Sequence, residues 1–320
     1  ENSRGNWVVV RKPIEPGWDD WTHRNHGPDN NLVSRDSTLE PPFLTQWLGR
    51  PTHEGYWGTT VVVAGGRMFT IWATRAFYGD NVSLIARSLH NGAVLWERPF
   101  TEEARQPYEN ERYNAGYNPG RCCAVATPEE LYLADGDGIL LLDAERGGEL
   151  GRLQGPKPDG QIKWMAVTGG TIAVLAGERD QMKTSTLQSY PTNPEGRHIA
   201  VYEQSTQRRL WEMRTEGPVD ERMIAAAGGR LYFHETGVAT RCLDLKTGRE
   251  LWRNGDSEFL AEADFRNPAQ VKGMLPSQAA LVATPQAVVV GCKWSRKLVA
   301  LSPQDGKLLW QHPVGGWGRS

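Results

Sequence analysis

The chain has 320 residues, and its 36 lysine and arginine residues nearly balance its 38 aspartate and glutamate residues. This balance excludes the overall positive field that binding to nucleic acid or to an anionic membrane surface requires, so we expect no nucleic-acid partner. The mean hydropathy is −0.54, and the sequence has no apolar run of the roughly 20 residues that cross a bilayer, so we expect no transmembrane segment.

The first residues differ from the rest of the chain. Residues 1–17 show no repeat, and we expect them to be the tail of a preceding segment. Residues 18–50, the leader, are polar and rich in proline, and they end in a short predicted strand from Phe43 to Leu48. We expect one large β domain over residues 18–320. Because the chain begins at Glu1 and its last repeat has no closing strand, we expect it to be a piece of a longer protein.

Two histidines of the leader form a candidate metal site. His23 and His26 lie near several acidic residues, among them Asp19 and Asp29. Imidazole and carboxylate groups are common ligands of divalent metal ions, so these residues could bind one. The alternative is that His23 hydrogen-bonds the leader to the domain that follows. No third ligand stands at a diagnostic spacing, so the sequence leaves both interpretations open.

The rest of the chain repeats one ending. Each copy has a strand, a tight turn with Asp, Asn or Ser and usually Gly, and a second strand that closes on a large aromatic residue, which is typical of a β-hairpin. Clear copies close at Trp96, Trp252 and Trp310, and copies that match the pattern less well close at Trp211 and Gly151. Counted from Trp47, the closing positions lie 41 to 60 residues apart. This spacing is in or just above the range of a four-stranded propeller blade.

A second hairpin precedes each of these endings. It has a short strand of small apolar residues, a Gly-Gly or Thr-Pro turn, and a strand of β-branched or aromatic residues. Two hairpins per copy make four strands, so the sequence predicts an all-β fold with five clear blades of a β-propeller. We expect the strand of small residues to lie nearest the propeller axis, where the blades crowd together.

The leader and the hairpins carry a family resemblance. The leader has a Trp-led polar stretch followed by a strand that ends in L-x-W, and the matching residues are Trp21, Asn30, Ser34, Leu44 and Trp47. With the Trp-terminated hairpins, the chain resembles the PQQ-like (quinoprotein-type) β-propeller repeat family, in a secreted bacterial form, from about Trp18 to Pro313. The resemblance implies six to eight blades in the complete ring, and it implies that the strand from Phe43 to Leu48 is a clasp on the last blade.

Aligning the blades predicts a binding site at one rim. The alignment uses the first apolar residue of each second strand: Met68, Leu131, Ile172, Leu231 and Val288. Nine residues earlier, at the start of the innermost strands, stand Thr59, Cys122, Lys163, Arg222 and Ala279. These positions should lie close to the mouth of the central channel, where propellers bind ligands.

The residues at this rim favour an anionic ligand. Lys163 and Arg222, with Arg121 beside Cys122, offer positive charge to a carboxylated cofactor or an acidic sugar. Trp164 adjoins Lys163 and is a candidate for an aromatic floor under a cofactor. The alternative is that these cations reach solvent or pair with upstream acids such as Asp220.

The cysteines carry a second resemblance. Cys122 and Cys123 are adjacent, like the disulfide that contacts the quinone in quinoprotein alcohol dehydrogenases, but the residues that follow them differ from those enzymes. The alternative is a pair of buried, reduced cysteines. The four cysteines of the chain form no C-x-x-C-H haem motif, and no nucleotide-binding fingerprint is present, so we expect neither haem nor nucleotide.

Three functions stay open at this point. The first, which we expect, is a periplasmic or extracellular propeller that binds a protein, a glycan or another anionic ligand, or acts as a scaffold. The second is a PQQ-dependent alcohol or sugar dehydrogenase with calcium, although the calcium and catalytic-base motifs of that family are not matched. The third is a lyase or hydrolase for acidic polysaccharide, in which Lys163 and Arg222 would neutralise a uronate. The sequence does not decide whether the protein is an enzyme, nor its ligand or oligomeric state.

Overall fold

The structure is a computed structural model, and it describes residues 13–40, 61–74, 81–99, 124–179, 182–184, 189–191, 195–263, 280–291 and 297–313. These residues form antiparallel β-sheets and one short helix, α2 (Ser257–Ala263). Within these ranges, no helix has both the length and the apolar character needed to cross a membrane.

Three blades are separate four-stranded sheets, in which each strand pairs with the next along the chain. Blade 1 contains β1 (Val61–Ala64), β2 (Arg67–Thr74), β3 (Asn81–Ser88) and β4 (Val94–Pro99). Blade 2 contains β5 (Ala124–Ala126), β6 (Glu130–Asp135), β7 (Gly138–Asp143) and β8 (Glu149–Gln154). Blade 5 contains β18 (Ala280–Ala283), β19 (Val288–Gly291), β20 (Lys297–Leu301) and β21 (Leu308–Pro313).

Blades 3 and 4 form one seven-stranded sheet because they share a strand. Blade 3 contains β9 (Gln161–Thr168), β10 (Thr171–Gly177), β13 (Glu195–Glu203) and the first part of β14 (Arg209–Ala227). Blade 4 contains the last part of β14, β15 (Arg230–Glu235), β16 (Ala239–Asp244) and β17 (Glu250–Asn254). A small hairpin, β11 (Met182–Thr184) and β12 (Ser189–Pro191), separates β10 from β13 along the chain.

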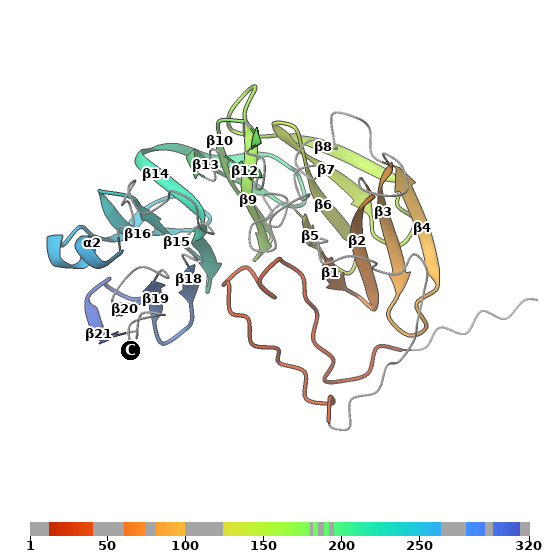
Figure 1. Cartoon of the computed structure of the whole chain (residues 1–320), viewed down its shortest axis with the longest axis horizontal. Helices are drawn as coiled ribbons and strands as arrows, with labels where there is room; N and C mark the ends of the chain where they lie inside the picture. Colours follow the sequence, from red (N-terminus) through yellow and green to blue (C-terminus); the bar gives the residue numbers. More distant parts are fainter. Residues whose placement is uncertain are drawn as a thin grey trace, which may run out of the picture.

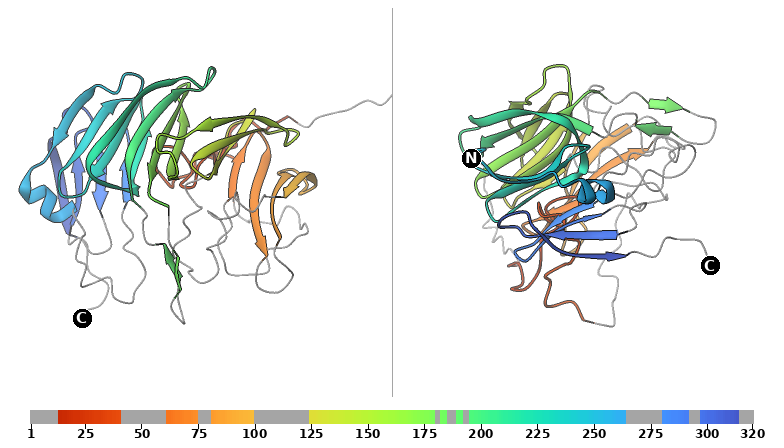
Figure 2. Two further views of the ribbon diagram at one scale, coloured as in Figure 1. Left: turned by 90° about the horizontal axis from the view of Figure 1, so that it is seen from above. Right: turned by 90° about the vertical axis from the view of Figure 1, so that its left-hand side faces the viewer.

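The five blades follow one another around an arc, and the innermost strands β1, β5, β9 and β18 face its concave side (Figure 1). The leader lies on the same side, and Figure 2 shows the blades from two further directions. The predicted all-β propeller of four-stranded blades is therefore confirmed. The clasp strand expected from Phe43 to Leu48 lies outside the described residues, and the six to eight blades of a complete ring stay a prediction.

The hydrophobic core is divided among the interfaces between blades. Four clusters of buried residues each join two consecutive blades, so that every neighbouring pair among the five has its own core. In the cluster between blades 1 and 2, Phe69 and Leu84 pack against Leu131 and Leu133. The small residues predicted for the innermost strands are fully buried, for example Ala126 and Ala226. Packing between blades, rather than within one sheet, therefore supplies the apolar burial of the fold.

The closing tryptophan of a blade contacts the turn of the next blade. The indole Nε1 of Trp252 donates to the Pro303 carbonyl at 2.8 Å, and a Cβ atom at Gly306 would lie 2.4 Å from the same ring. Trp211 and Gly248 repeat this contact between blades 3 and 4. Because these glycines have positive φ and face a ring, two independent constraints exclude a side chain there.

Blade 2 lacks this tryptophan, and the next turn differs to match. Gly151 stands where the other blades have Trp, and it lies opposite Gln207 of blade 3. Gln207 occupies the turn position of the glycine and keeps its positive φ, at 58°. Without an indole ring above the turn, the position accepts a side chain.

Candidate functional site

The innermost strands share one backbone position that faces the concave side of the arc. The position is the residue that pairs with the first apolar residue of the second strand, and in blades 1 to 5 it is Val63, Ala126, Val167, Ala226 and Ala283. We call this free edge of the innermost strands the inner edge. A backbone N–H at an unpaired strand edge needs an acceptor when it is buried.

The leader supplies an acceptor to all five positions in chain order. The carbonyl of Trp21 accepts from Val63, and the carbonyl of Thr22 accepts from Ala126 at 2.9 Å. The third acceptor is the Nε2 atom of His23, to which the N–H of Val167 donates at 3.2 Å. The remaining contacts belong to blades 4 and 5, where the carbonyls of Pro28 and Asp29 accept from Ala226 at 2.8 Å and from Ala283 at 2.9 Å.

Asn30 adds a second kind of contact to the inner edge. Its side-chain amide donates to the carbonyls of Ile224 and Leu281, each at 2.9 Å. Both carbonyls lie two residues before the shared N–H position, so they are equivalent in blades 4 and 5. Asn30 is 9% exposed and has a φ of 60°, a left-handed conformation that asparagine tolerates better than most residues. One side chain thus joins two blades.

His23 is a neutral hydrogen-bonding group in this arrangement. Nε2 accepts from the backbone, so Nδ1 carries the proton that it shares with the Thr22 hydroxyl at 2.7 Å. Burial, with a smaller contribution from the positive charge of His26, lowers the pKa of His23 to about 3. The structure thus gives His23 the role of hydrogen-bonding the leader to the propeller.

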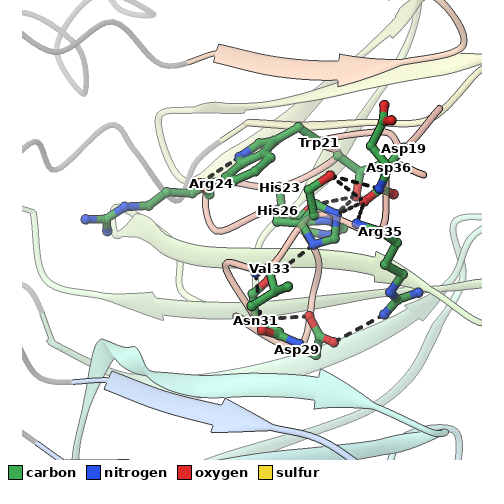
Figure 3. Close-up of polar contacts among 12 residues, drawn as sticks. Asp19, Trp21, His23, Arg24, His26, Asp29, Asn31, Val33, Arg35 and Asp36 are labelled. Carbon is green, nitrogen blue, oxygen red and sulfur yellow. Dashed lines mark hydrogen bonds and ion pairs between the residues drawn. The ribbon is translucent and has the colours of Figure 1, made fainter. Parts of the chain in front are cut away.

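His26 closes a tight turn in the leader and contacts two oxygens. Its Nε2 atom lies 2.6 Å from the carboxylate of Asp19, and its Nδ1 atom lies 3.1 Å from the carbonyl of Asn31 (Figure 3). Both oxygens are acceptors, so the protonated imidazolium satisfies both contacts. Although burial opposes it, hydrogen bonds from the Arg35 N–H and from His26 hold the pKa of Asp19 below its usual range.

These contacts bear on the predicted metal site. All four ring nitrogens of His23 and His26 have protein partners, and a metal ion bound to both rings would have to replace those hydrogen bonds. Across the described ranges, no group of three or more His, Cys, Asp or Glu side chains is placed to hold a metal ion. The geometry supports the alternative role of the leader histidines.

Lys163 and Arg222 lie where the alignment of the blades placed them, at the start of innermost strands. Both stand at irregular positions: Lys163 falls in the bulge where the β9–β10 pairing shifts, and Arg222 falls in the shift between β14 and β15. The Nζ atom of Lys163 donates to Gln161 at 3.1 Å. The guanidinium of Arg222 binds Asp220 through two contacts, Nε to Oδ1 at 2.7 Å and Nη2 to Oδ2 at 2.5 Å, and the Arg222 N–H donates to Oδ1 at 2.9 Å. The carboxylate that the sequence offered as an alternative partner therefore neutralises Arg222.

Of the other predicted site residues, the structure describes only Trp164. Trp164 is 4% exposed and belongs to the core cluster between blades 3 and 4, where it packs with residues such as Ala173 and Val201. Arg121, Cys122 and Cys123 lie outside the described residues, so their predicted roles stay predictions.

The fold family implies a quinone with calcium, and the described candidates do not fit this group: the guanidinium of Arg222 is engaged by Asp220, the indole of Trp164 is in the core, and the described residues offer no cluster of metal ligands. We therefore assign no reaction step to a quinone.

The sequence did not indicate how the leader binds. Four of the hydrogen bonds at the inner edge run between backbone atoms, and these have no signature in a side-chain pattern. Two residues gave a partial signal: Asn30, which matches the family pattern, and His23, for which a hydrogen-bonding role was one interpretation. The order of the contacts along the arc became visible only in the structure.

The chain matches one protein-family profile over more than half of its length. The profile is described as outer membrane protein assembly factor BamB, and it covers residues 135–319. No curated protein matches the chain in sequence.

Solved structures show the same architecture at low sequence identity. A quinohemoprotein alcohol dehydrogenase from Pseudomonas putida has a TM-score of 0.58 and 13% identity, and the match covers 94% of this chain and 48% of that chain. The corresponding enzyme from Comamonas testosteroni has a TM-score of 0.56 and 14% identity, with coverage of 92% and 49%. BamB from Moraxella catarrhalis has a TM-score of 0.44 and 14% identity, with coverage of 80% and 73%. The chain spans about half the length of the two dehydrogenases, and their similarity concerns the fold alone.

Proposed function

The chain belongs to the PQQ-like repeat family described as outer membrane protein assembly factor BamB, and from this premise we propose that it is a non-catalytic β-propeller that binds a protein partner. We place it in the periplasm or outside the cell. The proposal extends the words "assembly factor" in the family description to this chain, and it keeps the scaffold role expected from the sequence.

The leader at the inner edge carries the proposal. In all five described blades, an N–H group of the innermost strand donates to the chain's own residues 21–29. An enzyme of this fold needs reactive groups directed at a substrate near the axis. Here the five described N–H groups at the inner edge hold a segment of polypeptide, as in a rigid scaffold.

The outer strands offer apolar side chains to a partner. Each closing position follows a leucine, and in blades 1, 2 and 5 these leucines are about half exposed: Leu95 at 47%, Leu150 at 52% and Leu309 at 50%. In blades 3 and 4, Leu210 and Leu251 pack partly against the core. Exposed leucines on edge strands provide apolar contact area of the kind that protein interfaces bury.

Site-specific photo-crosslinking in cells tests the proposal on the full chain. A photoreactive amino acid replaces Leu95, Leu150 or Leu309, and the matched control replaces Val33, an exposed apolar residue of the leader. We expect one partner protein to be crosslinked from the outer-strand positions and not from Val33. Equal crosslinking from all four positions, or none above background, would contradict a specific partner at the outer strands.

A second experiment addresses the dehydrogenase alternative. Equilibrium dialysis with the quinone and calcium, followed by a dye-reduction assay with alcohols, should detect neither stoichiometric binding nor activity. Binding of one quinone per chain with substrate-dependent dye reduction would overturn the non-catalytic proposal and favour the enzyme.

A further inference from the structure

We propose that the inner edge of the propeller is a peptide-binding site and that residues 21–30 are its ligand, carried on the same chain. The ligand class is a polar peptide with one tight turn that offers carbonyl oxygens, one imidazole acceptor and one carboxamide. This inference is independent of the proposed function, because it holds whether or not a partner binds the outer strands.

The leader contacts the blades in the order in which they follow along the chain. Leader residues 21, 22, 23, 28 and 29 contact blades 1, 2, 3, 4 and 5 in that order, each at the same register position of the innermost strand. A loop that packed non-specifically would not meet one equivalent atom in five successive blades. The tight turn from His23 to His26, closed by two backbone hydrogen bonds, takes up the chain between blades 3 and 4.

The buried contacts of the leader segment are polar. From residue 21 to residue 30, the buried side chains are His23, His26 and Asn30, all of them polar. Hydrogen bonds therefore make the buried contacts of the segment, as in peptides that bind to sheet edges through main-chain contacts. The amide of Asn30 supplies specificity, since it contacts carbonyls of two blades at once.

An ion pair within the segment and a hydrogen bond just before it add contacts to the propeller. Arg24 lies 3.7 Å from the buried carboxylate of Glu221 in β14, and the carboxylate of Asp20 accepts from the N–H of Gly65 in blade 1. Both partners belong to the propeller, and through Glu221 a propeller side chain contacts the segment in addition to the strand edges. The inner edge thus has the features of a built site.

A cleaved full-length chain tests the proposal. A protease recognition sequence is inserted within residues 41–60, the folded protein is cut, and native mass spectrometry records whether the N-terminal piece stays bound. We expect it to remain bound at micromolar concentration. A labelled synthetic peptide of residues 13–40 should then exchange into the site and compete with the bound piece. Dissociation of the N-terminal piece on cleavage, with no binding of the peptide, would overturn the proposal.

Two variant peptides keep the test independent of folding, because the propeller stays wild type. The Asn30→Asp peptide replaces the amide donors with a carboxylate that faces two carbonyls, and we expect it to compete at least about tenfold more weakly. The Asn31→Asp peptide carries the same charge change one residue later, outside the segment, and should compete like the wild-type peptide. Equal competition by both variants would show that the amide contacts do not select the peptide.

Discussion

At the scale of single residues, the leader depends on a histidine that must stay neutral. His23 accepts from Val167 at Nε2, and protonation of that atom would place two donors against each other. Burial and the charge of His26 lower the pKa of His23 to about 3, well below its usual value near 6.5. Between about pH 6.5 and 3, the unfolded chain therefore binds a proton at His23 that the folded chain does not bind.

This difference predicts how stability depends on pH. The contribution of His23 is present above about pH 6.5 and is lost as the pH falls towards 3, with a slope of up to about 1.4 kcal/mol per pH unit for one proton. In His23→Gln the side-chain oxygen can accept from Val167 but does not titrate, so the part of the slope that His23 supplies between pH 6.5 and 4.5 should disappear, while His198, whose pKa burial also lowers, keeps its own part. Urea unfolding at several pH values measures it. The exposed His312→Gln should keep the wild-type slope, and a wild-type slope in His23→Gln would refute the role of His23.

The contact between Trp211 and Gly248 predicts a coupled effect of substitution. A methyl group at Gly248 would lie 2.7 Å from the indole of Trp211, whereas Gly228 has a similar positive φ and nothing within 4 Å of its added methyl group. Gly228→Ala should therefore cost about 1 kcal/mol of backbone strain, and Gly248→Ala about 1–3 kcal/mol more.

A double-mutant cycle checks the cause. In a Trp211→Gly background, which imitates the natural pair of Gly151 and Gln207, the extra cost of Gly248→Ala should vanish. Denaturant unfolding of the four proteins gives a coupling of about 1–3 kcal/mol if the ring is responsible. Additive effects would mean that the indole ring of Trp211 is not the cause of the extra cost at Gly248.

At the scale of elements, each blade depends on the next. The cores lie between blades, and the closing tryptophans extend these contacts to the outer strands. Blades 3 and 4 are joined further, because β14 runs continuously from the outer edge of one to the inner edge of the other. Loss of one interface contact should therefore affect a pair of blades, which gives the energetics a nearest-neighbour character.

Two tryptophans at the same blade position should differ strongly in their contribution to stability. Trp252 is 6% exposed and contacts the turn of blade 5, whereas Trp310, at the same position of blade 5, is 45% exposed. Trp252→Ala should cost about 3–5 kcal/mol, and Trp310→Ala less than about 1 kcal/mol. Thermal and urea unfolding compare the two variants. Similar losses would show that burial at the blade interface is not what the closing tryptophan provides.

At the scale of the whole molecule, the sequence predicted the features that follow from side-chain patterns, such as the blades. It missed the features that depend on backbone hydrogen bonds, such as the path of the leader. The Trp-terminated hairpins fixed the register of the blades, and that register correctly placed Lys163 and Arg222 at the start of innermost strands. The bidentate ion pair between Arg222 and Asp220 could also be anticipated, because residues two apart on a strand share a face. The path of the leader could not, since a carbonyl of Trp21 or Pro28 has no pattern that names its donor.

The leader should link the stability of blades that share no sheet. Because one segment contacts all five innermost strands, its release exposes five N–H groups together, those of Val63, Ala126, Val167, Ala226 and Ala283. Hydrogen exchange of the full chain should therefore show that Asn30→Asp lowers protection at all five positions, including blades 1 and 2, which Asn30 does not touch. Asn31→Asp, with the same added charge, should leave the five positions protected. If protection falls only in blades 4 and 5, the leader binds as independent local contacts, and each pair of blades holds its own part of the segment.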